Sequence, residues 1–432
     1  MKPASRIEAT IEVLTRIQDQ TRVPMDSVVG DYMRQRRYIG AKDRKEIAER
    51  VYNMIRAHAR LGWWLVKVGA QDTPRERVIA WLALGEQIDA ARAKELFDGS
   101  KYAPEPLNDK EAKRFAHLEG RSFDHPDMPV DAQLECPPAY AESLKTYFGK
   151  NYEAEMAAFL EPATLDLRVN TFVLTREEAA NSLKKDGVAT TETPYSPWGL
   201  RCNEKAYLAK TKALTKGHVS IQDEGSQMIA YLCDAQPGGQ VLDYCAGAGG
   251  KTLALAAMMK RKGRIVAMDN DEKRLMKGKQ RYKKSGLADI IEVRPLDEKG
   301  RKWVKRQKGK FDVVLTDVPC SGTGTWRRNP DMRWNTYGPE LAELIEIQKD
   351  ILERASKLVK ESGRLVYATC SLLPEENEQQ VDAFLKDNPD FEAQDVPEEL
   401  GKRYMRLTPH RHNTDGFFAA VLMKKSEGSE AA

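Results

Sequence analysis

The sequence is poor in cysteine and has no long apolar run. Only six of its 432 residues are cysteine: Cys136, Cys202, Cys233, Cys245, Cys320 and Cys370. None forms a C-x-x-C pair, and no spacing of cysteine and histidine matches a zinc site, so neither a disulfide framework nor a bound metal is expected. No stretch approaches the about 18 apolar residues of a membrane-spanning helix, and the N-terminus lacks the apolar segment of a signal peptide. These features predict a cytoplasmic protein without a membrane partner.

The charge balance is also nearly neutral. Charged residues make up 31% of the chain, but the formal net charge is only +4. The net charge of the whole chain therefore does not indicate a nucleic-acid partner. The length predicts two or three domains.

The pattern of apolar residues divides the chain into three segments and a tail. Residues 1–130 repeat apolar positions at helical spacing, as at Ile7, Ile11 and Leu14, which predicts an all-helical domain. Residues 137–220 mix helical and strand patterns, which predicts a small α+β domain with a capping box at Thr175 and Glu178. Residues 426–432 are small and polar, and a disordered tail is predicted there.

Residues 221–425 alternate short apolar strands with amphipathic helices. The predicted strands are residues 241–244, 265–268, 290–293, 311–315, 365–369 and 417–422. Such alternation is typical of βαβ units, so an α/β domain with a mostly parallel, doubly wound sheet is expected.

A glycine-rich loop follows the first of these strands, in the sequence VLDYCAGAGGKT at residues 241–252. Gly247, Gly249 and Gly250 allow a tight turn at the end of a strand and a close approach of a ligand to the backbone, which predicts a nucleotide-like cofactor. The phosphate-loop motif would need a glycine where Cys245 stands, and the spacing also differs from G-x-G-x-x-G. ATP, GTP and nicotinamide cofactors are therefore disfavoured.

Two aspartates follow the next two strands. Asp269 lies about 20 residues beyond the loop, where a carboxylate can accept hydrogen bonds from ribose hydroxyls, and Asp297 could meet an adenine amino group. Neither position supplies a cation for a phosphate, which fits S-adenosylmethionine. The alternative for Asp269 is a helix N-cap.

Two cysteines and an aspartate end neighbouring strands. Asp317 and Cys320 follow the fourth strand in DVPCSGTG, and Cys370 follows the fifth in ATCS. Inert buried thiols are the alternative, but the carboxyl edge of such a sheet is where ligands bind. A thiolate that adds to carbon 6 of cytosine activates carbon 5 for methylation, with a carboxyl group as proton donor.

At this point the residues resemble a known family. Residues 167–422 are similar to the Sun/RsmB-type RNA cytosine-5 methyltransferases. The matching motifs are LRVNTF (167–172), IQDEGSQ (221–227), the glycine-rich loop, DVPCSGTG (317–324), RRNPD (327–331) with Trp334, ATCSLLPEENE (368–378) and PHRHNTDGFFAA (409–420). The resemblance implies a class I methyltransferase domain with a mostly parallel, seven-stranded sheet.

The resemblance also implies roles for single residues. Cys370 would be the nucleophile, Cys320 would help to release the product, and Asp317 would touch both the base and the cofactor. The residues implied to hold S-adenosylmethionine are Cys245, Ala246, Gly247, Ala248, Gly249, Gly250, Lys251, Asp269, Arg274 and Asp297. The loop reads AGAGGKT where the family usually has AAPGGKT, so a less rigid loop is expected.

Several features suggest the partner. Residues 43–65 resemble the NusB-like extension of the bacterial RsmB branch, with a bundle that only packs on the core as the alternative. Residues 317–324, which carry Asp317 and Cys320, are hereafter called the reactive turn. Beside it, Trp326 could stack a base, and Arg327 and Arg328 could hold phosphates. The basic helix at residues 273–284 could contact RNA or be a solvated face.

The sequence therefore predicts a monomeric enzyme that methylates carbon 5 of a cytosine in RNA, with 16S ribosomal RNA as the first choice. The alternatives are the same chemistry on transfer RNA, or a non-catalytic RNA-binding factor in ribosome assembly.

Overall fold

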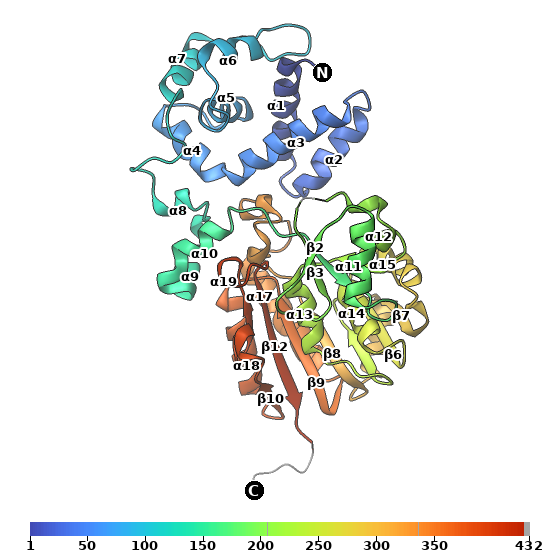
Figure 1. Cartoon of the computed structure of the whole chain (residues 1–432). Helices are drawn as coiled ribbons and strands as arrows, with labels where there is room; N and C mark the ends of the chain where they lie inside the picture. Colours follow the sequence, from blue (N-terminus) through green and yellow to red (C-terminus); the bar gives the residue numbers. More distant parts are fainter. Residues whose placement is uncertain (205, 336, 427–432) are drawn as a thin grey trace. The chain divides into compact units, whose positions relative to one another are not determined.

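The computed structural model describes residues 1–204, 206–335 and 337–426. The described chain divides into two compact units (Figure 1). The first unit holds residues 1–161 and 326–339, and the second holds residues 162–325 and the chain from Glu340 onward. The predicted tail, apart from Ser426, lies outside the described residues.

Residues 1–161, all of which are described, form helices and no strand. The helices are α1 (Pro3–Asp19), α2 (Met25–Gln35), α3 (Ala41–Arg56), α4 (His58–Lys67), α5 (Pro74–Leu84), α6 (Ala90–Leu96), α7 (Asp109–Leu118), α8 (Val130–Gln133), α9 (Pro138–Phe148) and α10 (Tyr152–Ala158). Ile7, Leu14 and Ile17 of α1 are buried in the core of this unit, as their spacing predicts. The predicted helical N-terminal domain is confirmed.

A segment from late in the sequence completes this helical unit. Residues 326–339, hereafter the anchored segment, follow the reactive turn but pack among the N-terminal helices. The Arg333 guanidinium donates to the carbonyls of Glu135 and Phe159, at 2.9 Å in each case. The Asp331 carboxylate accepts from the Met25 backbone N–H at 3.0 Å. The chain therefore leaves the second unit after Thr325 and returns to it at Glu340.

The predicted α+β segment, residues 137–220, is shared between the two units. Its helices α9 and α10 lie in the first unit, and its strands lie in the second. The strands are β1 (Asp166–Val169), β2 (Thr190–Glu192), β3 (Gly199–Cys202) and β4 (Val219–Ile221), in the antiparallel order β2-β3-β1-β4. Helices α11 (Arg176–Lys185) and α12 (Lys212–Thr215) accompany this small sheet, and α11 begins with the predicted capping box of Thr175 and Glu178.

The second unit is built on an eight-stranded sheet. Its strands are β5 (Gln240–Asp243), β6 (Arg264–Asp269), β7 (Ile291–Pro295), β8 (Phe311–Asp317), β9 (Val359–Thr369), β10 (Phe391–Gln394), β11 (Met405–Leu407) and β12 (Phe417–Lys424). The order is β10-β12-β9-β8-β5-β6-β7, and β11 also pairs with β12. Strands β5 to β9 are parallel, whereas β10, β11 and β12 are antiparallel to their neighbours.

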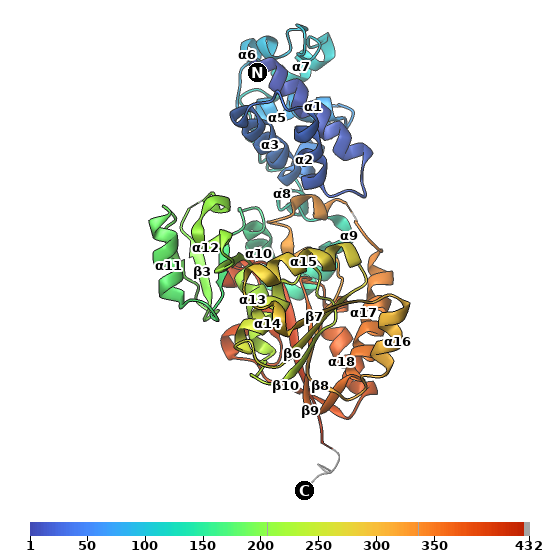
Figure 2. The ribbon, with the colours of Figure 1, turned by 90° about the vertical axis from the view of Figure 1, so that its right-hand side faces the viewer.

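Both faces of the sheet are buried beneath helices (Figure 2). Helices α13 (Glu224–Leu232), α14 (Gly250–Met258) and α15 (Glu272–Lys284) contribute to one face, and α17 (Leu341–Ser356) and α18 (Glu378–Asp387) cover the other. Successive residues of a strand point to opposite faces, so Val241 joins one core and Leu242 the other. This is the predicted doubly wound fold. The strand count differs from the seven expected because β11 adds a short edge, which has only three residues.

Candidate active site

The glycine-rich loop turns at the carboxyl end of β5 and leads into α14. Gly247 and Gly249 adopt φ values of +54° and +78°, in the left-handed region. A Cβ atom on Gly249 would lie 2.1 Å from the hydroxyl oxygen of Tyr282 on α15. Glycine is therefore required there both by the backbone conformation and by the close packing on α15.

Asp269 fastens this loop to the end of β6. Its carboxylate accepts from the backbone N–H of Gly247 at 2.7 Å and from that of Asp271 at 2.8 Å. Asp271, not Asp269, caps α15, so the N-cap alternative for Asp269 is wrong. Asp297 does cap a helix, α16 (Glu298–Lys305), through the N–H of Gly300 at 2.7 Å. Its contact with adenine stays a prediction.

Two arginines that were not among the predicted site residues also contact the loop. Arg281 donates to the Ala248 carbonyl at 2.8 Å, and Arg168 donates to the Gly250 carbonyl and to Gln222. Arg168 is only 3% exposed, and burial lowers its pKa to about 9. Arg168 belongs to the LRVNTF motif, so the motif was the available signal. The contact itself joins residues 82 positions apart.

The groups around the loop fit S-adenosylmethionine. Helix α14 begins at the loop without a side-chain cap, so its first amide groups suit a ligand carboxylate. Asp243 at the end of β5 accepts from the Thr252 hydroxyl with one oxygen, while its buried Oδ1 has no hydrogen-bond partner in the described structure. Burial raises the pKa of Asp243 to about 7. A cationic ligand with a ribose would meet a suitable set of carboxylates here.

The two predicted cysteines meet. The sulfur atoms of Cys320 and Cys370 lie 3.4 Å apart, and both residues are half-buried. They come together because β8 and β9 are parallel neighbours whose carboxyl ends share one edge. The Gly324 N–H also donates to the Cys370 carbonyl at 2.9 Å, which holds the two turns against each other.

The thiols differ in their surroundings. The hydrogen bond with Cys370, together with burial, raises the pKa of Cys320 well above its ordinary value, so Cys320 keeps its proton. Nearby, the Lys251 ammonium lies 2.7 Å from the Asp317 carboxylate. Burial lowers the pKa of Lys251, but Asp317 and the neighbouring Cys370 outweigh it and raise the pKa, so Lys251 stays charged. A cation therefore stands beside the sulfur pair.

A buried carboxylate ties the two cysteine turns together. Glu376 has no exposed surface and accepts from the Ser321 N–H at 2.8 Å and from the Gln348 amide at 2.9 Å. The hydroxyls of Ser321 and Ser371, the residues directly after the two cysteines, donate to its other oxygen. The Tyr367 hydroxyl donates to the Glu376 carbonyl at 2.6 Å. Glu376 belongs to the ATCSLLPEENE motif, and its contact with Ser321, 55 residues away, was not predicted from the sequence.

Of the expected RNA contacts beside the reactive turn, the one at Trp326 does not fit the structure. Trp326 has no exposed surface and Arg327 is 2% exposed, because both belong to the anchored segment. The Trp326 ring packs near Phe159 and lies 5.2 Å from the Arg333 guanidinium. Trp326 therefore cannot stack a base as placed, and that expectation is corrected. Arg328 is half-buried in the same segment, and its contact with RNA stays untested.

The remaining cysteines behave as small buried residues. Cys136, Cys202 and Cys233 are buried, and burial raises the pKa of each. Cys245 in the loop is half-buried, and burial raises the pKa of its thiol well above the ordinary value. Among the described residues no helix is long and apolar enough to cross a membrane, and no group of three or more acidic, histidine or cysteine side chains could hold a metal.

Comparison with known proteins agrees with this geometry. The family described as 16S rRNA methyltransferase RsmB/F matches residues 230–423, and its ferredoxin-like domain matches residues 137–208. The protein PH0851 superimposes with a TM-score of 0.78 at 26% identity, covering 98% of this chain and 99% of that one. A methyltransferase homologue from Pyrococcus horikoshii superimposes with a TM-score of 0.59 at 27% identity, covering 68% of this chain and 97% of that one. The second unit is thus a class I methyltransferase domain.

A curated relative extends the similarity to nearly the whole chain. The "Probable ribosomal RNA small subunit methyltransferase B" of Synechocystis is 31% identical over 423 residues, which span 90% of this chain and 93% of that protein. With the glycine-rich loop and the paired cysteines at one sheet edge, this places the chain as a methyltransferase of the RsmB/F family of RNA methyltransferases.

Proposed function

We propose that this protein transfers the methyl group of S-adenosylmethionine to carbon 5 of a cytosine in 16S ribosomal RNA through a covalent adduct at Cys370. The observation that carries the proposal is the 3.4 Å contact between the sulfurs of Cys320 and Cys370. The Cys320 turn follows β8, which lies next to β5, and the Cys370 turn follows β9, on the other side of β8. Strand β5 leads into the glycine-rich loop.

The chemistry begins with the Cys370 thiolate, which adds to carbon 6 of the cytosine. The electron pair released onto carbon 5 then forms the new bond to the methyl group. S-adenosylmethionine, when bound, would supply that group as an electrophile and would leave as S-adenosylhomocysteine, which keeps the electron pair of the broken sulfur–carbon bond. Loss of the carbon 5 proton and expulsion of the thiolate from carbon 6 restore the aromatic ring.

The surroundings of the two thiols support Cys370 as the nucleophile. Cys320 keeps its proton, so its S–H can donate in the contact with the Cys370 sulfur, in which either sulfur could be the donor. That leaves Cys370 as the sulfur that attacks. The Lys251 ammonium adds positive charge close to the same sulfur. Cys320 is then the group near enough to exchange a proton with Cys370 while the product leaves. Lys251 also holds Asp317, the carboxylate that we assign to the base and the cofactor.

The relatives support ribosomal RNA as the substrate, since the Synechocystis protein bears that name. The target base must leave its stack to reach a sulfur atom, so a single-stranded or flipped cytosine is expected. Transfer RNA remains the second candidate, because the same sulfur chemistry would serve it.

The test uses tritium-labelled S-adenosylmethionine with 16S ribosomal RNA and with transfer RNA. Cys370→Ala should abolish incorporation. In Cys320→Ala the Cys370 sulfur should still add to the base but should be released from it slowly, so a covalent protein–RNA complex should persist on a denaturing gel. Cys202→Ala, in the small sheet, is the control and should behave as the wild type.

Three outcomes would contradict the proposal. An adduct in Cys370→Ala and none in Cys320→Ala would reverse the two roles. Incorporation into transfer RNA alone would change the substrate. Tight binding of ribosomal RNA by the wild type without any incorporation would favour a non-catalytic assembly factor.

A further inference from the structure

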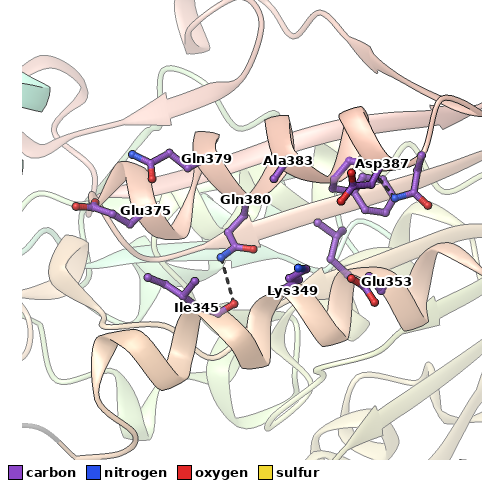
Figure 3. Close-up of a pocket in the computed structure, with 11 residues that line it drawn as sticks. Ile345, Lys349, Glu353, Glu375, Gln379, Gln380, Ala383 and Asp387 are labelled. Carbon is purple, nitrogen blue, oxygen red and sulfur yellow. Dashed lines mark hydrogen bonds between the residues drawn. The ribbon is translucent and has the colours of Figure 1, made fainter.

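We compare two hollows in the described structure that neither reactive cysteine lines, and the side chains that line them differ in charge. The first is a groove of about 280 Å³ between α17 and α18 (Figure 3). Its lining carries three carboxylates, Glu353, Glu375 and Asp387, against one cation, Lys349. This acidic lining is unsuited to a phosphate.

The second hollow is a crevice of about 330 Å³ between β4 and the end of α15, both within the second unit. Arg281 and Lys284 of α15 are in its lining, and none of the residues that line it is acidic. Its other side is formed by Ser220 and Ile221 of β4. The crevice thus combines two cations with a hydroxyl and an apolar wall.

The crevice is a built feature of the fold. The turn before β4 packs directly on the end of α15, because a Cβ atom on Gly217 would lie 2.8 Å from the Lys284 carbonyl. The Asn170 amide donates to the Ser285 carbonyl at 2.9 Å and to the Gly217 carbonyl at 3.3 Å, which joins the small sheet to α15. These contacts hold β4 and α15 at a set separation.

The lining matches the parts of a nucleotide. Lysine and arginine side chains neutralise the phosphates of a nucleic acid whatever its base sequence. Ile221 is 51% exposed although it is a large apolar residue, and it offers a surface to the face of a base. Because β4 is an edge strand of the small sheet, a single-stranded segment can approach this side.

The crevice is also connected to the cofactor loop. Arg281 lines the crevice and donates to the Ala248 carbonyl of the loop at 2.8 Å. An occupant of the crevice would therefore contact a side chain that holds the loop.

We propose that this crevice is a nucleotide subsite for the RNA substrate, which holds one phosphate and one base outside the target cytosine. The inference rests on the proposed function, because it takes RNA as the substrate. It adds a binding surface on β4 and α15 that the sulfur chemistry does not require.

The test compares Lys284→Ala with Lys283→Ala. Lys283 is the adjacent exposed lysine on the same helix and does not line the crevice. Binding of a 16S ribosomal RNA fragment is measured by fluorescence anisotropy at several salt concentrations. Lys284→Ala should weaken binding roughly fivefold and lower the slope of log K against log salt by about 1, since one phosphate contact is lost. Lys283→Ala should change neither.

A second pair of variants tests the base contact. Ile221→Ser should weaken binding of the same fragment without changing the salt slope, because an apolar contact releases no counterions. Val173→Ser, at another exposed apolar residue of the second unit, should leave binding unchanged. For Lys284→Ala and Ile221→Ser, kcat at saturating RNA should stay at the wild-type value while KM for RNA rises. The controls Lys283→Ala and Val173→Ser should keep both wild-type values.

The outcomes separate this inference from the proposed function. If the wild type methylates ribosomal RNA and Lys284→Ala matches Lys283→Ala in affinity and salt slope, the crevice is not a subsite although the function stands. If the wild type does not methylate RNA, the proposed function fails. If Lys284→Ala and Ile221→Ser both raise KM as described, the subsite is supported.

Discussion

Replacement of Glu376 by glutamine tests how the two cysteine turns are held. The carboxylate accepts from the Ser321 N–H, the Gln348 amide and the hydroxyls of Ser321 and Ser371. Glutamine keeps the shape and one acceptor oxygen, but its amide group faces the two serine hydroxyls. Both hydroxyls must then rotate and accept.

The structure gives the size of the effect. The two bonds to the remaining oxygen persist and the two hydroxyl bonds reverse, so four charge-assisted hydrogen bonds become neutral ones. At about 1 kcal/mol each, the free energy of unfolding should fall by about 4 kcal/mol. The turns that carry Cys320 and Cys370 should also shift. A displacement on the order of 1 Å at reacting atoms costs about 100-fold in rate, so kcat should fall between roughly 10-fold and 100-fold.

The assay is tritium incorporation at saturating RNA and S-adenosylmethionine, together with urea unfolding. Glu375→Gln is the matched control, because Glu375 is on the same turn but lines the α17–α18 groove instead. If Glu376→Gln lost stability but kept kcat within twofold of Glu375→Gln, Glu376 would not position the cysteines. If it also kept its stability, the hydrogen-bond network itself would be wrong.

Three further predictions concern the anchored segment, the buried Asp243 carboxyl group and the glycine-rich loop. Arg333→Ala should reduce the free energy of unfolding of the helical unit by about 3 kcal/mol and so lower its urea midpoint, because two buried carbonyls lose their hydrogen-bond donor. The control Arg354→Ala, at an exposed arginine, should change the midpoint little. Burial raises the pKa of Asp243 from 3.8 to about 7, so its contribution to stability is full below about pH 4 and is lost as the pH rises through 7. Between pH 4 and 8 the free energy of unfolding of the wild type should therefore fall by up to about 4 kcal/mol more than that of Asp243→Asn. An unchanged pH profile in the variant would refute this assignment. Gly249→Ala should weaken S-adenosylmethionine binding in calorimetry, because its Cβ would clash with Tyr282, whereas Gly238→Ala, also at positive φ but with open space, should leave cofactor binding unchanged.

Much of the second unit followed from local sequence patterns. The alternation of strands and helices predicted the doubly wound sheet, because periodicity reflects which side of each element is buried. The glycine-rich loop and the cysteines at 320 and 370 could be found because each lies within a few residues of the end of an apolar strand. The short strands β10 and β11 were missed, since they have only four and three residues and form by pairing with β12.

By itself, then, the sequence determined which residues stand at the carboxyl ends of the strands, because a strand, its turn and its side chains are neighbours along the chain. Only the tertiary structure decided what those residues contact. The sulfur pair joins residues 50 positions apart, and Glu376 reaches Ser321 across 55. The anchored segment joins Asp331 to Met25 across 306 residues, which buried Trp326 in the helical unit against expectation. Such contacts depend on which distant elements pack together, and the periodicity that marks a buried face does not say which partner covers it.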